Sequence, residues 1–220
     1  MKIVSINVGR RETLAGRSFN GVTGICKRPV AAPVRVSELG LEADAVVNGK
    51  YHGGPDQAVY VYRQEDYHWW SAELGQEVTA GTFGDNLTLS GLPQPDLLVG
   101  SRLAFGAVLL EVTAPRIPCN TLAQRMGDRQ FAKRFMRAER PGAYCRVLAT
   151  GALTAGDAFT VLAPAATEPQ PPVSIIELFR ASKAKPGVEQ LRRYLAAPID
   201  ARSRQAFERR LRQLSQSPGR

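Results

Sequence analysis

A proline-rich stretch at residues 163–172 divides the chain into two parts that must fold differently. Four of its ten residues are proline, which cannot continue a sheet and favours extended polyproline geometry. Short β-prone runs with Gly and Pro turns precede it, whereas the apolar spacing after it is helical. The sequence therefore predicts a strand-rich domain at 1–163, a linker at 164–172 and a helical module at 173–216.

The first part has the pattern of many short strands and few helices. Helical spacing covers 63–74, where Tyr67, Trp70 and Leu74 share one face and are expected in the core. Two more helices are expected at 121–126 and 129–137. Strands are expected at 2–8, 21–27, 34–37, 58–62, 86–89, 102–105, 108–113, 143–149 and 158–162. This order predicts an α+β, strand-rich, β-barrel-like fold with inserted helices.

Three short helices are expected after the linker. Ser174 followed by Glu177 forms a capping box, Pro186 suits a helix start, and Asp200 can cap the last helix. Residues 170–220 hold 11 Lys/Arg against 4 Asp/Glu, so most of the chain's net charge of +9 belongs here. This basic surface is either a solvated helix face or a docking surface for an acidic partner, and the nearly neutral main body does not indicate nucleic-acid binding.

The compartment follows from the amino terminus and the cysteines. The chain begins without the apolar run of a secretion signal, and no apolar run approaches the length that spans a bilayer, so we expect a cytoplasmic protein without membrane contact. Cys26, Cys119 and Cys145 are an odd number without a C-x-x-C pair, which argues against a disulfide framework and a structural zinc site. Both a monomer and a homodimer are compatible with this pattern.

Cys119 stands where a predicted buried strand gives way to a helix. Pro115 and Pro118 stiffen the connection, because each fixes its own φ and keeps the preceding residue extended. Amide groups at the helix start, together with the cation of Arg116, favour the thiolate. A thiolate can act as a nucleophile or as a ligand for a soft metal. The alternative is an inert, buried cysteine.

Two glycine-rich loops add candidate site residues. The run His52-Gly53-Gly54-Pro55-Asp56 combines a titratable ring, backbone able to adopt positive φ, and a carboxylate. The loop at 81–88 can point the Asn86 amide inward. Lys27 and Arg146 are cations that could meet a phosphate or carboxylate. Taken singly, each loop is better explained as a plain turn, and each cation could equally be a surface charge.

Together these motifs resemble the MOSC family, named for the carboxy-terminal domain of molybdenum cofactor sulfurases, and within it the YiiM type. The resemblance rests on the helical tail and on four stretches: Thr23-Gly-Ile-Cys-Lys-Arg-Pro29, His52-Gly-Gly-Pro-Asp-Gln-Ala-Val59, Gly81-Thr-Phe-Gly-Asp-Asn-Leu-Thr88 and Pro115-Arg-Ile-Pro-Cys-Asn120. It implies a MOSC barrel that binds the pterin-type molybdenum cofactor and reduces N-hydroxylated compounds, such as hydroxylaminopurines or amidoximes, to amines. The chain departs from the family pattern at two places. The run 41–50 retains only part of the usual motif, and Ser101 stands where the family typically has Asp.

The resemblance also implies roles for individual residues. Cys119 would be the thiolate on the metal, and His52 would orient the pocket and supply protons. The cofactor would be bound by Lys27, Gly53, Gly54, Asp56, Asn86, Arg116 and Arg146. A separate flavin-type reductase would deliver electrons, because the sequence lacks a dinucleotide fingerprint and an iron–sulfur cysteine set. Pyridoxal phosphate is associated with the family only, and not with this chain. The large domain that binds it in full cofactor sulfurases does not fit within 220 residues.

Two other functions fit the same residues. Cys119 with His52 as base could form a thiol hydrolase or transferase that needs no metal. The protein could also be a non-enzymatic carrier or sensor that holds the cofactor, or a sulfur atom on Cys119, and passes it to a partner through the basic tail.

Overall fold

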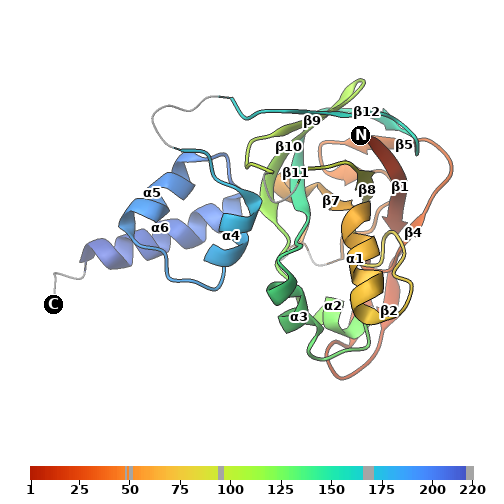
Figure 1. The fold of residues 1–220 in the computed structure, drawn as a ribbon, viewed down its shortest axis with the longest axis horizontal. Coiled ribbons are helices and arrows are strands. Elements are labelled where there is room, and N and C mark those ends of the chain that lie inside the picture. Colours follow the sequence, from red (N-terminus) through yellow and green to blue (C-terminus); the bar gives the residue numbers. More distant parts are fainter. Residues whose placement is uncertain (48, 50–51, 94–96, 166–170, 217–220) are drawn as a thin grey trace.

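The computed structural model describes residues 1–47, 49, 52–93, 97–165 and 171–216 (Figure 1). Its strands are β1 (Lys2–Gly9), β2 (Glu12–Leu14), β3 (Gly21–Thr23), β4 (Lys27–Pro29), β5 (Val34–Ser37), β6 (Gly40–Leu41), β7 (Val59–Arg63), β8 (Leu87–Ser90), β9 (Arg102–Phe105), β10 (Val108–Pro115), β11 (Ala143–Ala149), β12 (Gly151–Leu153) and β13 (Thr160–Leu162). Its helices are η1 (Pro55–Gln57), α1 (Gln64–Leu74), α2 (Asn120–Arg125), α3 (Phe131–Ala138), α4 (Ile175–Ala181), α5 (Val188–Ala196) and α6 (Ala201–Gln216).

Most of the strands form one sheet in the order β13-β9-β10-β11-β7-β8-β1-β4. Neighbours are antiparallel except β7 and β8, which are parallel. The sheet curves back on itself, so that β1 meets the segment just before β13. The backbone N–H of Ile3 donates to the carbonyl of Asp157 at 2.9 Å, and the backbone N–H of Gly156 donates to the carbonyl of Ile3 at 2.8 Å. The strand-rich α+β fold is confirmed, and these bonds give it the barrel-like curvature that was expected.

Two buried clusters hold the strand-rich part together. The larger lies against the sheet and includes Ile6, Val61 and Leu110, all fully buried. The smaller is aromatic and joins α1 to α3, with the Trp70 and Phe135 rings stacked at 5.9 Å. Tyr67 and Trp70 are 3% and 1% exposed, which confirms that the aromatic face of α1 belongs to the core.

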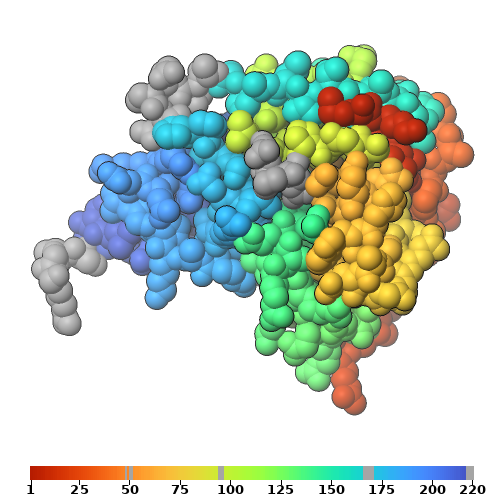
Figure 2. All heavy atoms as spheres, in the orientation of Figure 1, coloured from red at the N-terminus to blue at the C-terminus, as the bar shows by residue number. Residues whose placement is uncertain are grey.

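The three carboxy-terminal helices lie beside the sheet as the blue lobe in Figure 1 and Figure 2. Ser174 and Glu177 form the predicted capping box of α4, and Asp200 Oδ1 accepts from the N–H groups of Arg202 and Ser203 at the start of α6. Ile175, Leu178 and Tyr194 belong to the same apolar cluster as the sheet. We call 173–216 the helical module; its independence as a domain stays a prediction, and 166–170 of the predicted linker lie outside the described residues.

The structure differs from the expected elements at one place near the site. The predicted strand at 21–27 is two strands, β3 and β4, separated by a tight turn. A Cβ atom at Gly24 would lie 1.9 Å from the carbonyl oxygen of Ala45, so the backbones approach too closely for a side chain. The turn therefore packs against the segment after β6. Within the described residues, no helix has the length and apolar character needed to cross a membrane.

Candidate active site

A cavity of about 350 Å³ opens beside the start of α2. Its wall is formed by turns that precede β4 and β7, by the segment after β6, and by the end of β10. The predicted site residues that line it are Lys27, His52, Gly53, Asn86, Arg116 and Cys119. Six residues from four separate stretches of the sequence, which were proposed for one site, therefore share one cavity.

Cys119 occupies the position that the sequence indicated. It is the N-cap of α2, with extended backbone (φ −122°, ψ 171°), and is half-buried. Burial opposes ionisation of the thiol, but a hydrogen bond with the His52 side chain, the charge of Arg116 and a hydrogen bond with the Leu122 backbone outweigh it and lower the pKa of Cys119 to about 6. The side chain is therefore mostly thiolate at neutral pH.

Arg116 places a buried cation against this thiolate. Its side chain is 4% exposed, and Nη1 donates to the carbonyl of Phe83. The guanidinium carbon lies 5.2 Å from the centre of the Tyr60 ring. Among the described residues, Arg116 Nε has no hydrogen-bond partner although it is buried. A buried donor without a partner costs free energy, so this nitrogen is a candidate contact for a ligand.

Lys27 is paired within the wall. Its Nζ lies 2.5 Å from Asp44 Oδ2, and burial lowers the pKa of Lys27 while Asp44 partly restores it. Asp44 also accepts from the Gly9 backbone at 2.7 Å and from Asn86 Nδ2 at 2.8 Å. Asn86 Oδ1 in turn accepts from the Tyr60 backbone at 3.0 Å. Lys27 and Asn86 are thus fixed by protein partners, which leaves Arg116 as the more available cation.

The two glycines after His52 have positive φ, as the sequence indicated. Gly53 (φ 69°) lines the cavity, and a Cβ atom there would lie 2.7 Å from Val46 Cγ1. Gly54 (φ 86°, ψ 170°) is not among the lining residues, and a Cβ atom there would have no described atom within 4 Å. The backbone conformation itself therefore requires glycine at both positions.

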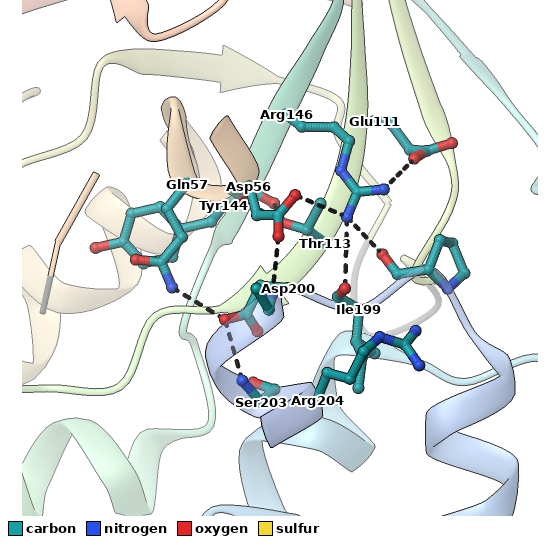
Figure 3. Close-up of polar contacts among 12 residues, drawn as sticks. Asp56, Gln57, Glu111, Thr113, Tyr144, Arg146, Ile199, Asp200, Ser203 and Arg204 are labelled. Carbon is teal, nitrogen blue, oxygen red and sulfur yellow. Dashed lines mark hydrogen bonds and ion pairs between the residues drawn. The ribbon is translucent and has the colours of Figure 1, made fainter. Parts of the chain in front are cut away.

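Arg146 and Asp56 do not line the cavity. Figure 3 shows them together at the base of α6, where Arg146 Nη2 lies 3.0 Å from Asp56 Oδ1 and Arg146 Nη1 lies 3.1 Å from Glu111 Oε2. Arg146 also donates to the carbonyls of Pro198 and Ile199, at 3.1 and 3.4 Å. The structure thus places both residues between the sheet and the helical module, and their cofactor contacts stay predictions.

The structure adds lining residues that sequence reasoning missed, above all Asp44, Tyr60 and Tyr144. The Tyr60 and Tyr144 rings lie 4.9 Å apart on adjacent strands β7 and β11. Both tyrosines lie in predicted strands, and the sequence pattern gave them no role in the site. In the strand 143–149 it was Arg146 that was predicted to contact a ligand. Asp44 lies in the run 41–50, which departs from the family pattern. That departure was the one sequence feature that could have indicated a role for this run in the site.

These observations describe a protein with a site for a small molecule. A strand-rich α+β fold contains a cavity of the size of small-molecule sites, and a thiolate, a buried arginine and a glycine turn meet in it. Within the described residues, no group of three or more His, Cys, Asp or Glu side chains is arranged to hold a metal ion.

The chain belongs to the MOSC domain family, whose model matches residues 48–160. It is 32% identical over 154 residues to YflK of Bacillus subtilis (strain 168), covering 70% of each chain. A protein named "Reductase" from Gibberella moniliformis is 32% identical over 181 residues, but the match spans 31% of that longer chain. The crystal structure of YiiM from Geobacillus stearothermophilus superposes with a TM-score of 0.78 at 28% identity, covering 96% of this chain and 98% of YiiM.

Proposed function

We propose that this protein binds the pterin-type molybdenum cofactor in the Cys119 cavity and reduces N-hydroxylated compounds to amines. The observation that carries the proposal is the acidic thiol of Cys119, which faces a cavity beside the buried cation of Arg116. Membership of the MOSC family supports the cofactor, and similarity to a protein named a reductase supports the type of reaction.

The residues present fit such a cofactor in three respects. A volume of about 350 Å³ lies within the range of small-molecule sites. A thiolate is a donor that soft metal centres select. The unpartnered Nε of Arg116 offers a charged donor to the anionic part of a ligand. Cys119 would then bind the metal, and Arg116 would bind the anionic group. Gly53 and Asn86 would form the cavity walls on either side.

The overall reaction breaks an N–O bond, consumes two electrons and two protons, and releases an amine and water. When bound, the molybdenum centre would supply the two-electron exchange of an oxygen atom. His52 would hold a proton near Cys119, because both side chains line the same cavity and His52 contributes to the lowered pKa of the Cys119 thiol. The tyrosine rings of Tyr60 and Tyr144 form an apolar side of the cavity that would exclude water from a planar substrate.

We propose a separate flavin-type reductase as the electron donor. The experiment combines the cofactor-loaded protein with such a reductase, NADH and either 6-hydroxylaminopurine or benzamidoxime, and measures amine formation by chromatography. Turnover by the parent and its loss in Cys119→Ser would support the proposal. Equal turnover by the two proteins would remove Cys119 from the mechanism.

A second function is favoured by the pairing of Cys119 with His52. A thiolate beside an imidazole is the arrangement of thiol hydrolases and transferases, which need no metal. This function predicts that metal-free protein cleaves an activated thioester and that iodoacetamide abolishes the activity. Metal-free protein without such activity, beside a loaded protein that reduces N-hydroxylated substrates, would reject it.

A further inference from the structure

Arg202 connects the helical module to the wall of the cavity. It is the second residue of α6, and its side chain leaves the module to reach the turn before β7. Nη1 donates to Gln57 Oε1 at 2.7 Å, and Nη2 donates to the carbonyls of Gly49 and Gly53 at 3.0 and 3.2 Å. All three acceptor residues line the cavity. Within the described part of the chain, one side chain thus binds the wall at three points.

We propose that Arg202 is a positioning residue for this wall, so that the helical module forms part of the active site. Gly53 follows His52 directly, and both line the cavity together with Cys119. A displacement of the Gly53 carbonyl would therefore move the imidazole away from the thiolate. Arg202 acts through the wall and does not need to touch a substrate or cofactor.

The start of α6 is anchored firmly enough for this role. Asp56 Oδ2 accepts from the Ala201 backbone at 2.8 Å, and Asp200 Oδ1 accepts from the Ser203 backbone at 3.2 Å (Figure 3). The Arg146 contacts with Asp56, Pro198 and Ile199 join the same region to β11. The backbone at Arg202 is therefore fixed both by caps at the start of α6 and by contacts with Arg146 on β11.

Arginine suits the position better than lysine. A guanidinium is planar and presents five N–H donors in a fixed fork, so it can satisfy two carbonyls and an amide oxygen at once. The wall it holds contains Gly53, which has a positive φ and no side chain of its own to anchor it. A substituent without the fork would leave the carbonyls of Gly49 and Gly53 without this donor.

The test compares Arg202→Gln with Arg204→Gln. Arg204 is a matched control, because it also donates to two carbonyls, at 2.8 and 2.9 Å, but those of Leu195 and Ala197 belong to the helical module. Hydrogen exchange would be followed by mass spectrometry in the peptide 52–59, with the peptide 143–149 as an internal reference. The expected result is exchange about tenfold faster in 52–59 for Arg202→Gln and unchanged for Arg204→Gln.

A kinetic measurement separates positioning from simple stabilisation. In the loaded enzyme, Arg202→Gln is expected to lower kcat per bound molybdenum about tenfold, because His52 supplies protons in the chemical step, with KM for the N-hydroxylated substrate within threefold of the parent. Arg204→Gln should change neither. If Arg202→Gln does not fold, Gln57→Ala removes one of the three described acceptors and should accelerate exchange in 52–59 by a smaller factor.

Unchanged exchange in 52–59 in folded Arg202→Gln would overturn the inference, as would an equal acceleration in Arg204→Gln. The kinetic measurement rests on the proposed function, whereas the exchange measurement does not. A parent protein that reduces no N-hydroxylated compound would therefore refute the proposed reaction and leave the role of Arg202 to be decided by exchange.

Discussion

Lys27 Nζ and Asp44 Oδ2 lie 2.5 Å apart, and the two side chains are 10% and 6% exposed. The pair joins the start of β4 to the segment after β6, and both residues belong to the cavity wall. Asp44 also binds Asn86 and the backbone of Gly9, so it connects four separate parts of the chain. The wall is therefore a buried polar network, in which every member depends on the others.

Replacement of Asp44 by Asn should destabilise the protein by about 3 kcal/mol, because it leaves the buried Lys27 without its counter-charge. The free energy of unfolding would be measured in urea. Glu42→Gln provides the control, since its partner Arg35 and Glu42 itself are 79% and 58% exposed, and a loss below about 1 kcal/mol is expected. Similar losses for the two variants would show that the Lys27–Asp44 pair is not a structural element.

The acidity of Cys119 predicts a pH dependence in metal-free protein. The thiolate reacts with iodoacetamide, so the alkylation rate should rise with pH through a midpoint of about 6 instead of the ordinary 9. His52→Ala removes the hydrogen bond that favours the thiolate, and its midpoint should move upward. Mass spectrometry would assign the modified residue. Cys145 is the internal control, because burial raises the pKa of its thiol.

The same shift links pH to stability. The folded pKa of Cys119 is lower than its value of 9.0 in an unfolded chain, so the unfolded state binds the proton more tightly. The resulting stabilisation is fully present above pH 9 and is lost as pH falls through about 6. Cys119→Ser should therefore abolish this part of the pH dependence between 9 and 6, measured as urea unfolding at several pH values. An unchanged profile would contradict the lowered pKa.

Gly54→Ala should destabilise the protein by about 2 kcal/mol for backbone reasons. At φ 86° and ψ 170°, Gly54 lies in a region that residues with a Cβ atom avoid, although no described atom would contact that Cβ. Gly187→Ala, at φ −76° in equally open space, adds a Cβ without backbone strain and should cost less, about 1 kcal/mol, because alanine is a poorer helix N-cap than glycine. Thermal unfolding distinguishes the two, and a neutral Gly54→Ala would show that the turn can adopt another conformation.

Gly53→Ala should respond to a second substitution. Its Cβ would lie 2.7 Å from Val46 Cγ1, so Val46→Ala is expected to recover part of the stability lost in Gly53→Ala. Val46→Ala should recover nothing in Gly54→Ala, because no described atom lies within 4 Å of a Cβ atom there. A double-mutant cycle with urea unfolding measures this coupling, and equal recovery in the two backgrounds would contradict it.

The parts of the fold with local periodicity were predictable from the sequence. The strands at 34–37, 102–105 and 143–149 have the predicted bounds, because alternation and turn residues mark both ends. The short strands β2, β6 and β12 were missed, since two or three residues carry too little pattern. Gly24 interrupts the predicted strand at 21–27 because of its close approach to Ala45, which is a tertiary contact.

The site was predictable where its chemistry lies within one motif. Cys119 and Arg116 come from a single strand-to-helix connection, so their proximity followed from the sequence. Asp44 and Tyr144 reach the cavity through the packing of distant segments, which no local pattern encodes. Arg146 was recognised as a useful cation, but its partners Asp56 and Glu111 emerge from strand pairing and from the position of α6.

The central claim is that Cys119 holds a molybdenum cofactor. The most direct measurement is the molybdenum and pterin content of the parent and Cys119→Ser, purified from a host that makes the cofactor. Our account predicts near-stoichiometric molybdenum and pterin in the parent, and loss of the metal from a Cys119→Ser protein with an unchanged circular dichroism spectrum. Absence of both from a folded parent, in a host that loads another molybdoenzyme, would contradict the account and favour metal-free thiol chemistry at Cys119.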